Sequence, residues 1–280
     1  MNVTLVPGFN PGPYTGTGNN TYLILGRHPT LIDAATGKLP HLEALAGALG
    51  TLPLARVLVT HAHSDHVVGC VSLAQRWPDL EFAKIPWPEQ DKRYDVTWRQ
   101  IEEGDVVVAG DIKLRVVHTP GHAPDHACFF EEVGRTLFCG DLIVQGSTVV
   151  IPGSRSGNLA AYLASLRRVL DLKPARVLPA HGPEIRDPVS QIQYYFDHRR
   201  RREDQIISAL QEGCTTCAEI VDRIYPLLLR NLREAASESV LAHLIKLKDE
   251  GRVRENDRQW TLSLIHISEP TRLGMISYAV

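Results

Sequence analysis

A cluster of ligand-type side chains occupies residues 61–66, in the run Thr60-His61-Ala62-His63-Ser64-Asp65-His66. It directly follows Arg56–Thr60, a short apolar run of the kind that forms a buried strand. Side chains alternate along an extended chain, so we expect His61 and His63 to point the same way and Asp65 and His66 to turn toward a second point. Neutral imidazole and carboxylate groups are ligands of Zn²⁺. The spacing therefore predicts ligands for two metal sites.

Four groups on one loop do not complete two metal sites, so further ligands must come from other parts of the chain. Single ligand-type residues follow three other predicted strands where each strand ends; they are His122 after 113–118, Asp141 after 136–139 and His181 after 176–178. A glycine adjoins each of them and allows close approach of the backbone. We expect these three residues to join the cluster at one edge of the fold.

The elements that must position these residues alternate between short strands and helices as far as residue 186, a pattern typical of an α/β domain in which helices cover sheets. The expected strands are 3–6, 21–25, 30–32, 56–60, 105–108, 113–118, 127–130, 136–139 and 176–178, and the expected helices are 40–49, 67–77 and 159–170. From residue 187 the pattern is almost entirely helical, with helices expected at 191–211, 217–225 and 233–250 and a hairpin at 252–262. Three helices and a hairpin are the order of a winged helix. We therefore expect one domain at 1–186 and a winged-helix-like domain at 187–262.

The last stretch, residues 263–280, fits neither a helical nor a strand period. It resembles translated sequencing-adapter sequence and follows the strand expected to close the hairpin. We expect it to be a non-native or disordered tail.

The composition of the 280 residues is that of an ordinary soluble protein, with 44% hydrophobic residues and a formal net charge of −2. No run of 18 or more apolar residues predicts a membrane span. The five cysteines, without an evident export signal, indicate reduced thiols and a cytoplasmic protein. The near-neutral charge argues against bulk electrostatic capture of nucleic acid. The sequence leaves the oligomeric state open.

The metal motifs resemble those of the metallo-β-lactamase superfamily, which has THxHxDH, PGH, GD and a late histidine in a Gly-Pro-rich loop, in this order. The resemblance implies an αββα sandwich with two zinc ions, or other divalent metals, between its sheets. One metal would take His61, His63 and His122, the other would take Asp65, His66 and His181, and Asp141 would bridge them. The resemblance further implies that a hydroxide shared by the metals attacks the substrate, with Asp65 orienting it or accepting its proton.

Other polar residues are candidates for supporting the ligands or contacting substrate; they are Asp33, Asn20, Asp125, His126, Ser147, Thr148, His198 and Arg199. Asp33 ends a strand and could accept a proton from a ligand histidine. Three further histidines, His28, His41 and His243, are expected at the surface. The pair Cys214 and Cys217 has no second pair and is interpreted as incidental.

From about residue 6 to 262 the chain looks most like the beta-lactamase-like protein 2 family, in which this fold precedes a winged helix. The matching segments are 10–13, 20–23, the metal motifs, 146–149, 180–183 and the helix that holds Tyr194, His198, Arg199 and Glu203. That resemblance implies endoribonuclease activity on single-stranded RNA. The run Arg199–Arg202 could contact phosphates, although consecutive helical residues point all round the helix. The acidic third helix of the winged segment does not favour a reader of duplex DNA.

Hydrolysis of a phosphodiester in single-stranded RNA is therefore the first functional hypothesis. The second is hydrolysis of a thioester or other small ester, as in hydroxyacylglutathione hydrolases, although the basic glutathione-binding pattern of that family is absent from this sequence. A non-enzymatic nucleic-acid-binding protein and an iron-dependent persulfide oxygenase are further alternatives. Antibiotic hydrolysis is disfavoured, because true β-lactamases of this fold usually lack an aspartate at the bridging position, where this chain has Asp141.

Overall fold

The computed structural model describes residues 2–263, so the tail expected at 263–280 lies outside the described residues apart from Ser263. The chain divides into two compact units, and the boundary falls between Arg199 and Arg200. It lies inside a long helix, α6 (Pro188–Gln211), whereas the domains predicted from the sequence meet after residue 186.

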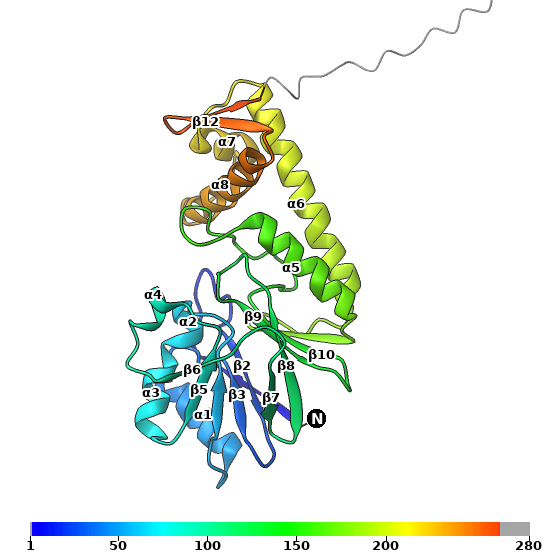
Figure 1. The fold of residues 1–280 in the computed structure, drawn as a ribbon. Helices are drawn as coiled ribbons and strands as arrows, with labels where there is room; N and C mark the ends of the chain where they lie inside the picture. The colour runs from blue at the N-terminus through cyan, green and yellow to red at the C-terminus, as the bar shows by residue number, and fades with distance from the viewer. Residues whose placement is uncertain (1, 264–280) are drawn as a thin grey trace, which may run out of the picture. The chain divides into compact units, whose positions relative to one another are not determined.

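The first sheet of the first unit has six strands in chain order (Figure 1). They are β1 (Val3–Pro7), β2 (Asn20–Ile24), β3 (Thr30–Ile32), β4 (Arg56–Leu58), β5 (Glu81–Lys84) and β6 (Trp98–Gln100). The first three pair antiparallel, and β3 to β6 pair parallel. The helices between them are α1 (Leu39–Leu49), α2 (Ser64–Val67), α3 (Gly69–Arg76) and α4 (Pro88–Asp91).

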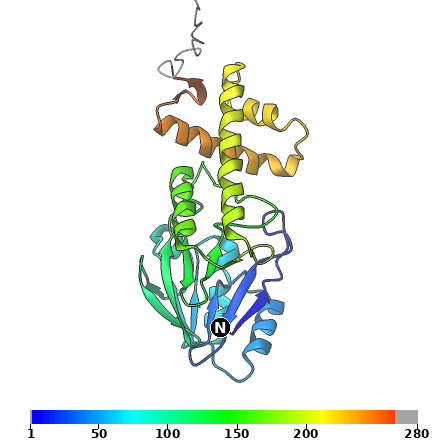
Figure 2. The ribbon, with the colours of Figure 1, turned by 90° about the vertical axis from the view of Figure 1, so that its right-hand side faces the viewer.

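The second sheet has five strands in the order β11-β10-β9-β8-β7. They are β7 (Val106–Ala109), β8 (Ile112–His118), β9 (Ala127–Glu131), β10 (Thr136–Gly140) and β11 (Arg176–Pro179), with α5 (Leu159–Leu172) between the last two. Only β10 and β11 pair parallel in this sheet. The two sheets lie face to face in Figure 1 and in the turned view of Figure 2.

Alternation along the strands builds the layers on both sides of the first sheet. In β2, Tyr22 and Ile24 face a core shared with Phe129 and Phe138 of the second sheet. The intervening Leu23 faces the opposite way, into a separate core formed with the residues of α1 and α3. Because successive strand side chains point to opposite faces, a strand buried on both faces is apolar throughout. Helices on one side and a second sheet on the other produce the expected layered sandwich.

The second unit is a small helical domain closed by a hairpin. It contains the end of α6, α7 (Cys217–Ile224), the 3₁₀ turn Arg230–Leu232, α8 (Arg233–Asp249), β12 (Val253–Asn256) and β13 (Gln259–Leu262). Ile206, Val240 and Trp260 share its core. This is the winged-helix order that the sequence predicted.

Several expectations about individual elements and histidines need correction. The sequence pattern did not identify β5, β6 or α4, and it assigned residues 64–66 of α2 to a loop. His28 is exposed, but His41 and His243 are fully buried. His41 contacts the hydroxyl of Thr21 at 3.0 Å, and burial lowers the pKa of His41 to about 4. A buried polar partner is therefore what keeps this neutral histidine inside the fold. None of the helices among residues 2–263 is long and apolar enough to cross a membrane.

Candidate metal centre

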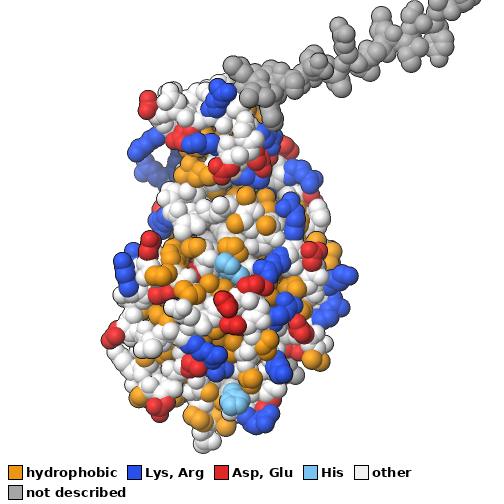
Figure 3. Space-filling view, viewed as in Figure 1, with side chains coloured by type: hydrophobic (Ala, Val, Ile, Leu, Met, Phe, Trp, Pro, Cys, Tyr) orange, Lys and Arg blue, Asp and Glu red, His pale blue; other side chains and the backbone are white. Residues whose placement is uncertain are grey.

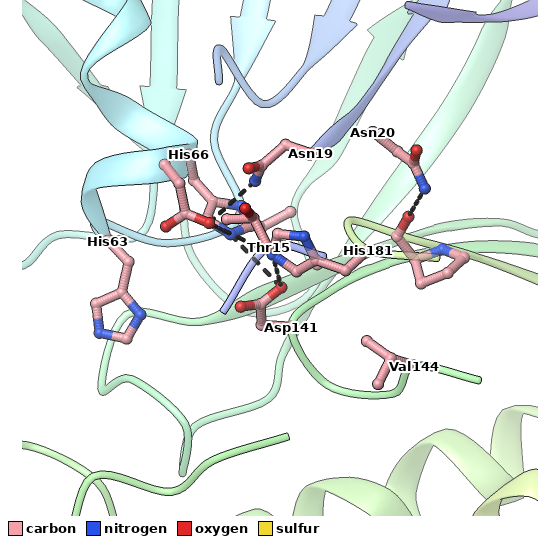
Figure 4. Close-up of polar contacts among 12 residues, drawn as sticks. Thr15, Asn19, Asn20, His63, His66, Asp141, Val144 and His181 are labelled. Carbon is pink, nitrogen blue, oxygen red and sulfur yellow. Dashed lines mark hydrogen bonds and ion pairs between the residues drawn. The ribbon is translucent and has the colours of Figure 1, made fainter. Parts of the chain in front are cut away.

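The ligand-type residues come together because the strands that precede them end at one edge of the sandwich. β4 leads into His61, His63 and the short helix α2, which holds Asp65 and His66. The other three residues follow strands of the second sheet; they are His122 after β8, Asp141 after β10 and His181 after β11. Figure 4 shows His66, Asp141 and His181 pointing toward one another, with His63 beside them.

The first group of ligand atoms consists of three imidazole nitrogens. Nδ1 of His63 lies 3.0 Å from Nε2 of His61 and 2.8 Å from Nε2 of His122. Nitrogens bound at about 2.0–2.1 Å to a tetrahedral ion lie roughly 3.3 Å from one another. The three rings are thus close to the spacing that a single metal ion requires, and they form a group capable of holding one.

The second group mixes carboxylates with imidazoles. Nε2 of His181 lies 3.4 Å from Oδ2 of Asp65 and 3.3 Å from Oδ1 of Asp141. Nε2 of His66 lies 3.6 Å from the same Asp65 oxygen and 3.5 Å from the same Asp141 oxygen. Asp65, His66 and His181 form another group capable of holding a metal ion.

Asp141 stands between the two groups. While its Oδ1 faces His66 and His181, its Oδ2 lies 3.5 Å from Nε2 of His122 in the first group. His61, His66 and Asp141 also satisfy the spacing for a metal ion, so the two groups are contiguous. One carboxylate therefore faces both groups with different oxygens, as a bridging ligand must.

Hydrogen bonds behind the rings leave the inward nitrogens able to bind metal. Nδ1 of His66 donates to Oδ2 of Asp33 at 2.8 Å, and Nδ1 of His122 donates to the carbonyl of Val150 at 2.8 Å. Because these oxygens only accept, each ring in its neutral form carries its proton on Nδ1 and turns the lone pair of Nε2 toward the cluster. Within the described residues, Nε2 of His66 and Oδ1 of Asp141 are buried and lack hydrogen-bond partners. A divalent metal ion fits these donor atoms and would satisfy them.

The two groups differ in their electrostatics. Burial is the main reason that the pKa of His63 falls to about 3 and that the pKa values of His61 and His122 lie below the usual 6.5. In the second group, burial is outweighed by the carboxylates, so that the pKa of His181 rises to about 10 and that of His66 rises well above its usual value. The first group thus excludes protons, whereas the second attracts positive charge.

Asp33 anchors the ligand loop from the end of β3. Its carboxylate accepts the backbone N–H of Thr60 at 2.7 Å as well as the hydroxyl of Thr60 and the ring proton of His66. Since the hydroxyl donates to Asp33, its own oxygen accepts the Nδ1 proton of His61 at 3.1 Å. Asp33 has φ of +60°, a conformation that aspartate tolerates better than most residues. One aspartate thus fixes the rings of both His61 and His66.

Asp125 and His126 support the cluster rather than joining it. Asp125 accepts the backbone N–H of Ala62 at 2.9 Å and contacts the ammonium of the buried Lys84 at 3.0 Å. His126 uses Nε2 to accept the backbone N–H of Asp141 at 3.1 Å, which occupies the lone pair that a metal ligand would need. A Cβ on Gly140, whose φ is +49°, would lie 2.8 Å from that nitrogen, so this close approach requires glycine.

The sequence pattern missed two supporting residues near the cluster. Lys84 lies on β5, a strand that the pattern did not identify, and an isolated lysine gives no signal for burial. Asn19 donates from Nδ2 to Oδ2 of Asp65 at 3.2 Å. The predicted Asn20 instead donates to the carbonyls of Pro179 and Gly182, and it points away from the cluster toward the His181 loop (Figure 4).

The remaining predicted residues lie in the loop after Asp141 or on α6. Ser147 is exposed and Thr148 half-buried, and neither hydrogen-bonds to a clustered residue in the described part of the chain. His198 is half-buried with its ring beside that of Tyr194. Arg199 is buried, donates to the carbonyl of Val149 and lies over the ring of Tyr162. Its guanidinium is therefore committed to an internal role, contrary to the expectation that it could contact phosphates.

Comparisons with known proteins find a matching family for each of the two units. Residues 14–181 match the metallo-beta-lactamase superfamily, and residues 216–260 match the beta-lactamase associated winged helix domain. The beta-lactamase-like protein 2 homolog of Drosophila melanogaster is 33% identical over 267 residues, covering 90% of this chain and 89% of that protein. An atrochrysone carboxyl ACP thioesterase of Claviceps purpurea (strain 20.1) is 32% identical over 232 residues, covering 80% and 72%.

A solved structure shares the fold across both units. The beta-lactamase domain protein of Burkholderia ambifaria superposes with a TM-score of 0.80 at 24% identity, covering 93% of this chain and 91% of that one. The family match extends over more than half of the chain and includes all seven clustered residues. With its sandwich of two sheets, its cluster at the strand ends and its C-terminal winged helix, the chain belongs to the metallo-β-lactamase superfamily.

Proposed function

We propose that this chain is a hydrolase with a dinuclear metal centre, and that a thioester or related ester is its substrate. The observation that carries the first part is the carboxylate of Asp141, whose two oxygens face two separate groups of ligand atoms. His61, His63 and His122 would hold one ion, and Asp65, His66 and His181 would hold the other. Zinc suits this set of imidazole and carboxylate donors.

Two divalent ions, when bound, lower the pKa of water and offset the negative charge that develops on the attacked group. The residues of the chain would orient the groups that take part in this reaction. The pKa of Asp65 lies below its usual range because, against the effect of burial, His66 and His181 favour its charged form. Its carboxylate is therefore ionised at neutral pH and able to accept a hydrogen bond from water. Asp33 and Thr60 hold the rings of His61 and His66 in the orientation that this role requires.

The preference for a thioester over RNA comes from the state of the basic run Arg199–Arg202. Arg199 is buried and internally bonded, and Arg202 lies 4.2 Å above the ring of Tyr225, so the basic run offers fewer groups to phosphates than its sequence indicates. Basic and acidic side chains are interspersed over the face shown in Figure 3. RNA binding draws much of its affinity from basic side chains on phosphates. The similarity to a named thioesterase supports the same choice.

Single-stranded RNA is the second candidate. It is favoured by the similarity to a beta-lactamase-like protein 2 homolog, which spans 90% of this chain and so includes both units. Arg201 is exposed and would be a basic residue able to contact phosphates.

A paired assay separates the two candidates. The zinc-loaded protein is given an acyl-pantetheine thioester, S-lactoylglutathione and a labelled single-stranded RNA, and free thiol and RNA fragments are measured. We expect thiol release with intact RNA. Cleaved RNA with intact thioesters would make single-stranded RNA, and not a thioester, the preferred candidate substrate. Asp65→Asn serves as the control for contaminating enzymes, because it should abolish the activity that belongs to this site.

A further inference from the structure

Asn19 lies just before β2 and is almost fully buried, with 2% of its surface exposed. Its Nδ2 donates to Oδ2 of Asp65 at 3.2 Å, and this is the oxygen that faces His66 and His181. The backbone of Asn19 also forms a β-bridge with His181. Asn19 is therefore in contact with two residues of the second ligand group, one through its side chain and one through its backbone.

Asn10 determines which way the Asn19 amide points. Oδ1 of Asn10 accepts the backbone N–H of Asn19 at 2.9 Å, and a backbone N–H is always a donor. This contact places the NH₂ of Asn10 on the other side, where it donates to Oδ1 of Asn19 at 2.6 Å. With its oxygen engaged, Asn19 must present its own NH₂ to Asp65. A fixed backbone donor thus sets the orientation of both amides.

The surroundings of the two amides are shaped to hold them. A Cβ on Gly8 would lie 2.7 Å from Oδ1 of Asn10 and 3.1 Å from Cβ of Asn19. Gly18 has φ of +118°, and a Cβ there would lie 3.3 Å from the same Asn10 oxygen. The hydroxyl of Thr15 donates to the backbone carbonyl of Asn10 at 2.7 Å. The loop before β2 therefore packs closely around the Asn10–Asn19 pair.

We propose that Asn19, oriented by Asn10, is a positioning residue for Asp65 and tunes the affinity of the second ligand group for its metal ion. This inference rests on the proposed function, because it takes Asp65 to be a ligand of that group. The amide holds the carboxylate in place without neutralising it, so the charge of Asp65 stays available for a cation. The first group, which has no contact with Asn10 or Asn19 among the described residues, keeps its affinity in this scheme.

Asn10→Asp tests the relay at a residue that does not touch Asp65. The new carboxylate still accepts the backbone N–H of Asn19 but cannot donate to its Oδ1. The Asn19 amide is then driven to turn and present its oxygen to Asp65, which repels it. Titration of the full-length, metal-free protein with Zn²⁺ should show affinity for the second ion reduced about 10–100-fold, the range seen when the supporting partner of a ligand is lost. Affinity for the first ion should match that of the wild type.

Asn158→Asp is the matched control, since it makes the same chemical change elsewhere. Asn158 caps α5 by accepting the N–H of Ala161 at 2.8 Å, and aspartate caps helices equally well. Both zinc affinities should therefore stay at the wild-type level. Asn19→Ala removes the amide that donates to Asp65, and it tests the positioning role of Asn19 if Asn10→Asp does not fold.

The outcomes separate this inference from the proposed function. A wild-type protein that binds fewer than two zinc ions contradicts the dinuclear centre itself. A wild type that binds two, together with Asn10→Asp and Asn19→Ala variants that bind both with unchanged affinity, overturns the positioning role alone. An equal loss of affinity for both zinc ions in the folded variants also overturns the positioning role, because that result indicates a general structural effect.

Discussion

The two ligand groups lie side by side but present opposite environments to a cation. His61, His63 and His122 are neutral rings gathered without a carboxylate of their own, and burial keeps the pKa of His63 at about 3. In the second group, Asp65 and Asp141 are ionised and raise the pKa of His181 to about 10. The first group therefore has vacant lone pairs at neutral pH, whereas protons occupy ring nitrogens of the second.

The difference shows how one carboxylate can serve two unlike neighbours. Asp141 is the charge that the first group otherwise lacks, and it is also half of the charge in the second. The first group depends on ring orientation, since neutral ligands bind metal only through correctly placed lone pairs. The second depends on charge, and positive charge reaches it as protons or as metal. Variants at single residues should separate the two groups.

Asp141→Asn should have the largest effect, because it weakens both groups at once. Asparagine keeps the shape but removes the charge, and its NH₂ faces either His122 or the pair His66 and His181. We expect weaker binding of both zinc ions and a fall in hydrolysis of at least about 100-fold, above the range for loss of a supporting residue. Zinc titration and kcat/KM on the preferred substrate measure the two effects.

Two comparisons make that result specific. His63→Ala should weaken only the first ion and His181→Ala only the second, so Asp141→Asn alone should affect both. Asp171→Asn, an exposed position on α5, is the matched control and should change neither. A fully active Asp141→Asn enzyme would contradict the bridging role.

Asp33→Asn should have a smaller effect, confined to the second group, because the oxygen that the amide keeps still accepts the Thr60 hydroxyl that holds His61. The backbone N–H of Thr60 holds the oxygen of the new amide, so its NH₂ faces Nδ1 of His66. His66 must then accept on Nδ1 and carry its proton on Nε2, where it blocks the metal. Asparagine tolerates the positive φ at this position, so the backbone is preserved.

We expect affinity for the second ion to fall about 10–100-fold, with the first ion unaffected. Nitrogen NMR shifts of the imidazoles report the change of tautomer directly, and zinc titration reports the affinity. An unchanged His66 tautomer with normal binding of both ions would show that Asp33 serves the backbone alone.

The sequence pointed to the seven residues that the structure brings together, because its motifs are local and follow predicted strands. Each of His122, Asp141 and His181 adjoins a glycine at a strand end, and an apolar strand is recognisable from a few residues. Contacts between distant segments were harder to predict. Nothing local distinguishes Asn19 from Asn20, and only the register of β2 against the His181 loop directs Asn19 to Asp65 and Asn20 away from it.

Elements and side chains whose placement depends on distant segments were also hard to predict from the sequence. The strands β5 and β6 were missed because they are short and carry Lys84 or Trp98–Gln100, which lack the apolar signal of a buried strand. His41 was expected at the surface because a polar residue near a helix start is usually exposed. Thr21, distant in the sequence, supplies the partner that permits its burial. Arg199 was expected to be able to contact phosphates, because nothing near it in the sequence shows that its guanidinium is buried. Its acceptor is the carbonyl of Val149, which is distant in the sequence.

The smallest expected effect is a difference in protons released when each ion binds. Because the pKa values of His66 and His181 are raised, these rings are protonated at pH 7.5 in the metal-free protein and must lose protons to bind zinc. The first group, with pKa values below 6.5, has none to lose. Raised pKa values also mean that these two protonated rings stabilise the metal-free fold most below pH 6.5. The contribution of His181 is lost as the pH rises through about 10, and that of His66 is lost well above pH 6.5.

Zinc titration calorimetry in buffers of different ionisation heat measures this release. We expect close to zero protons for one ion and up to about two for the other, with affinity for the latter rising as much as about tenfold per pH unit for each proton. His181→Ala should remove the release assigned to that ring, whereas His28→Ala, at an exposed position, should leave it unchanged. Equal release from both ions would mean that the shared carboxylate of Asp141 makes the two groups electrostatically alike, and the contrast between them would fail.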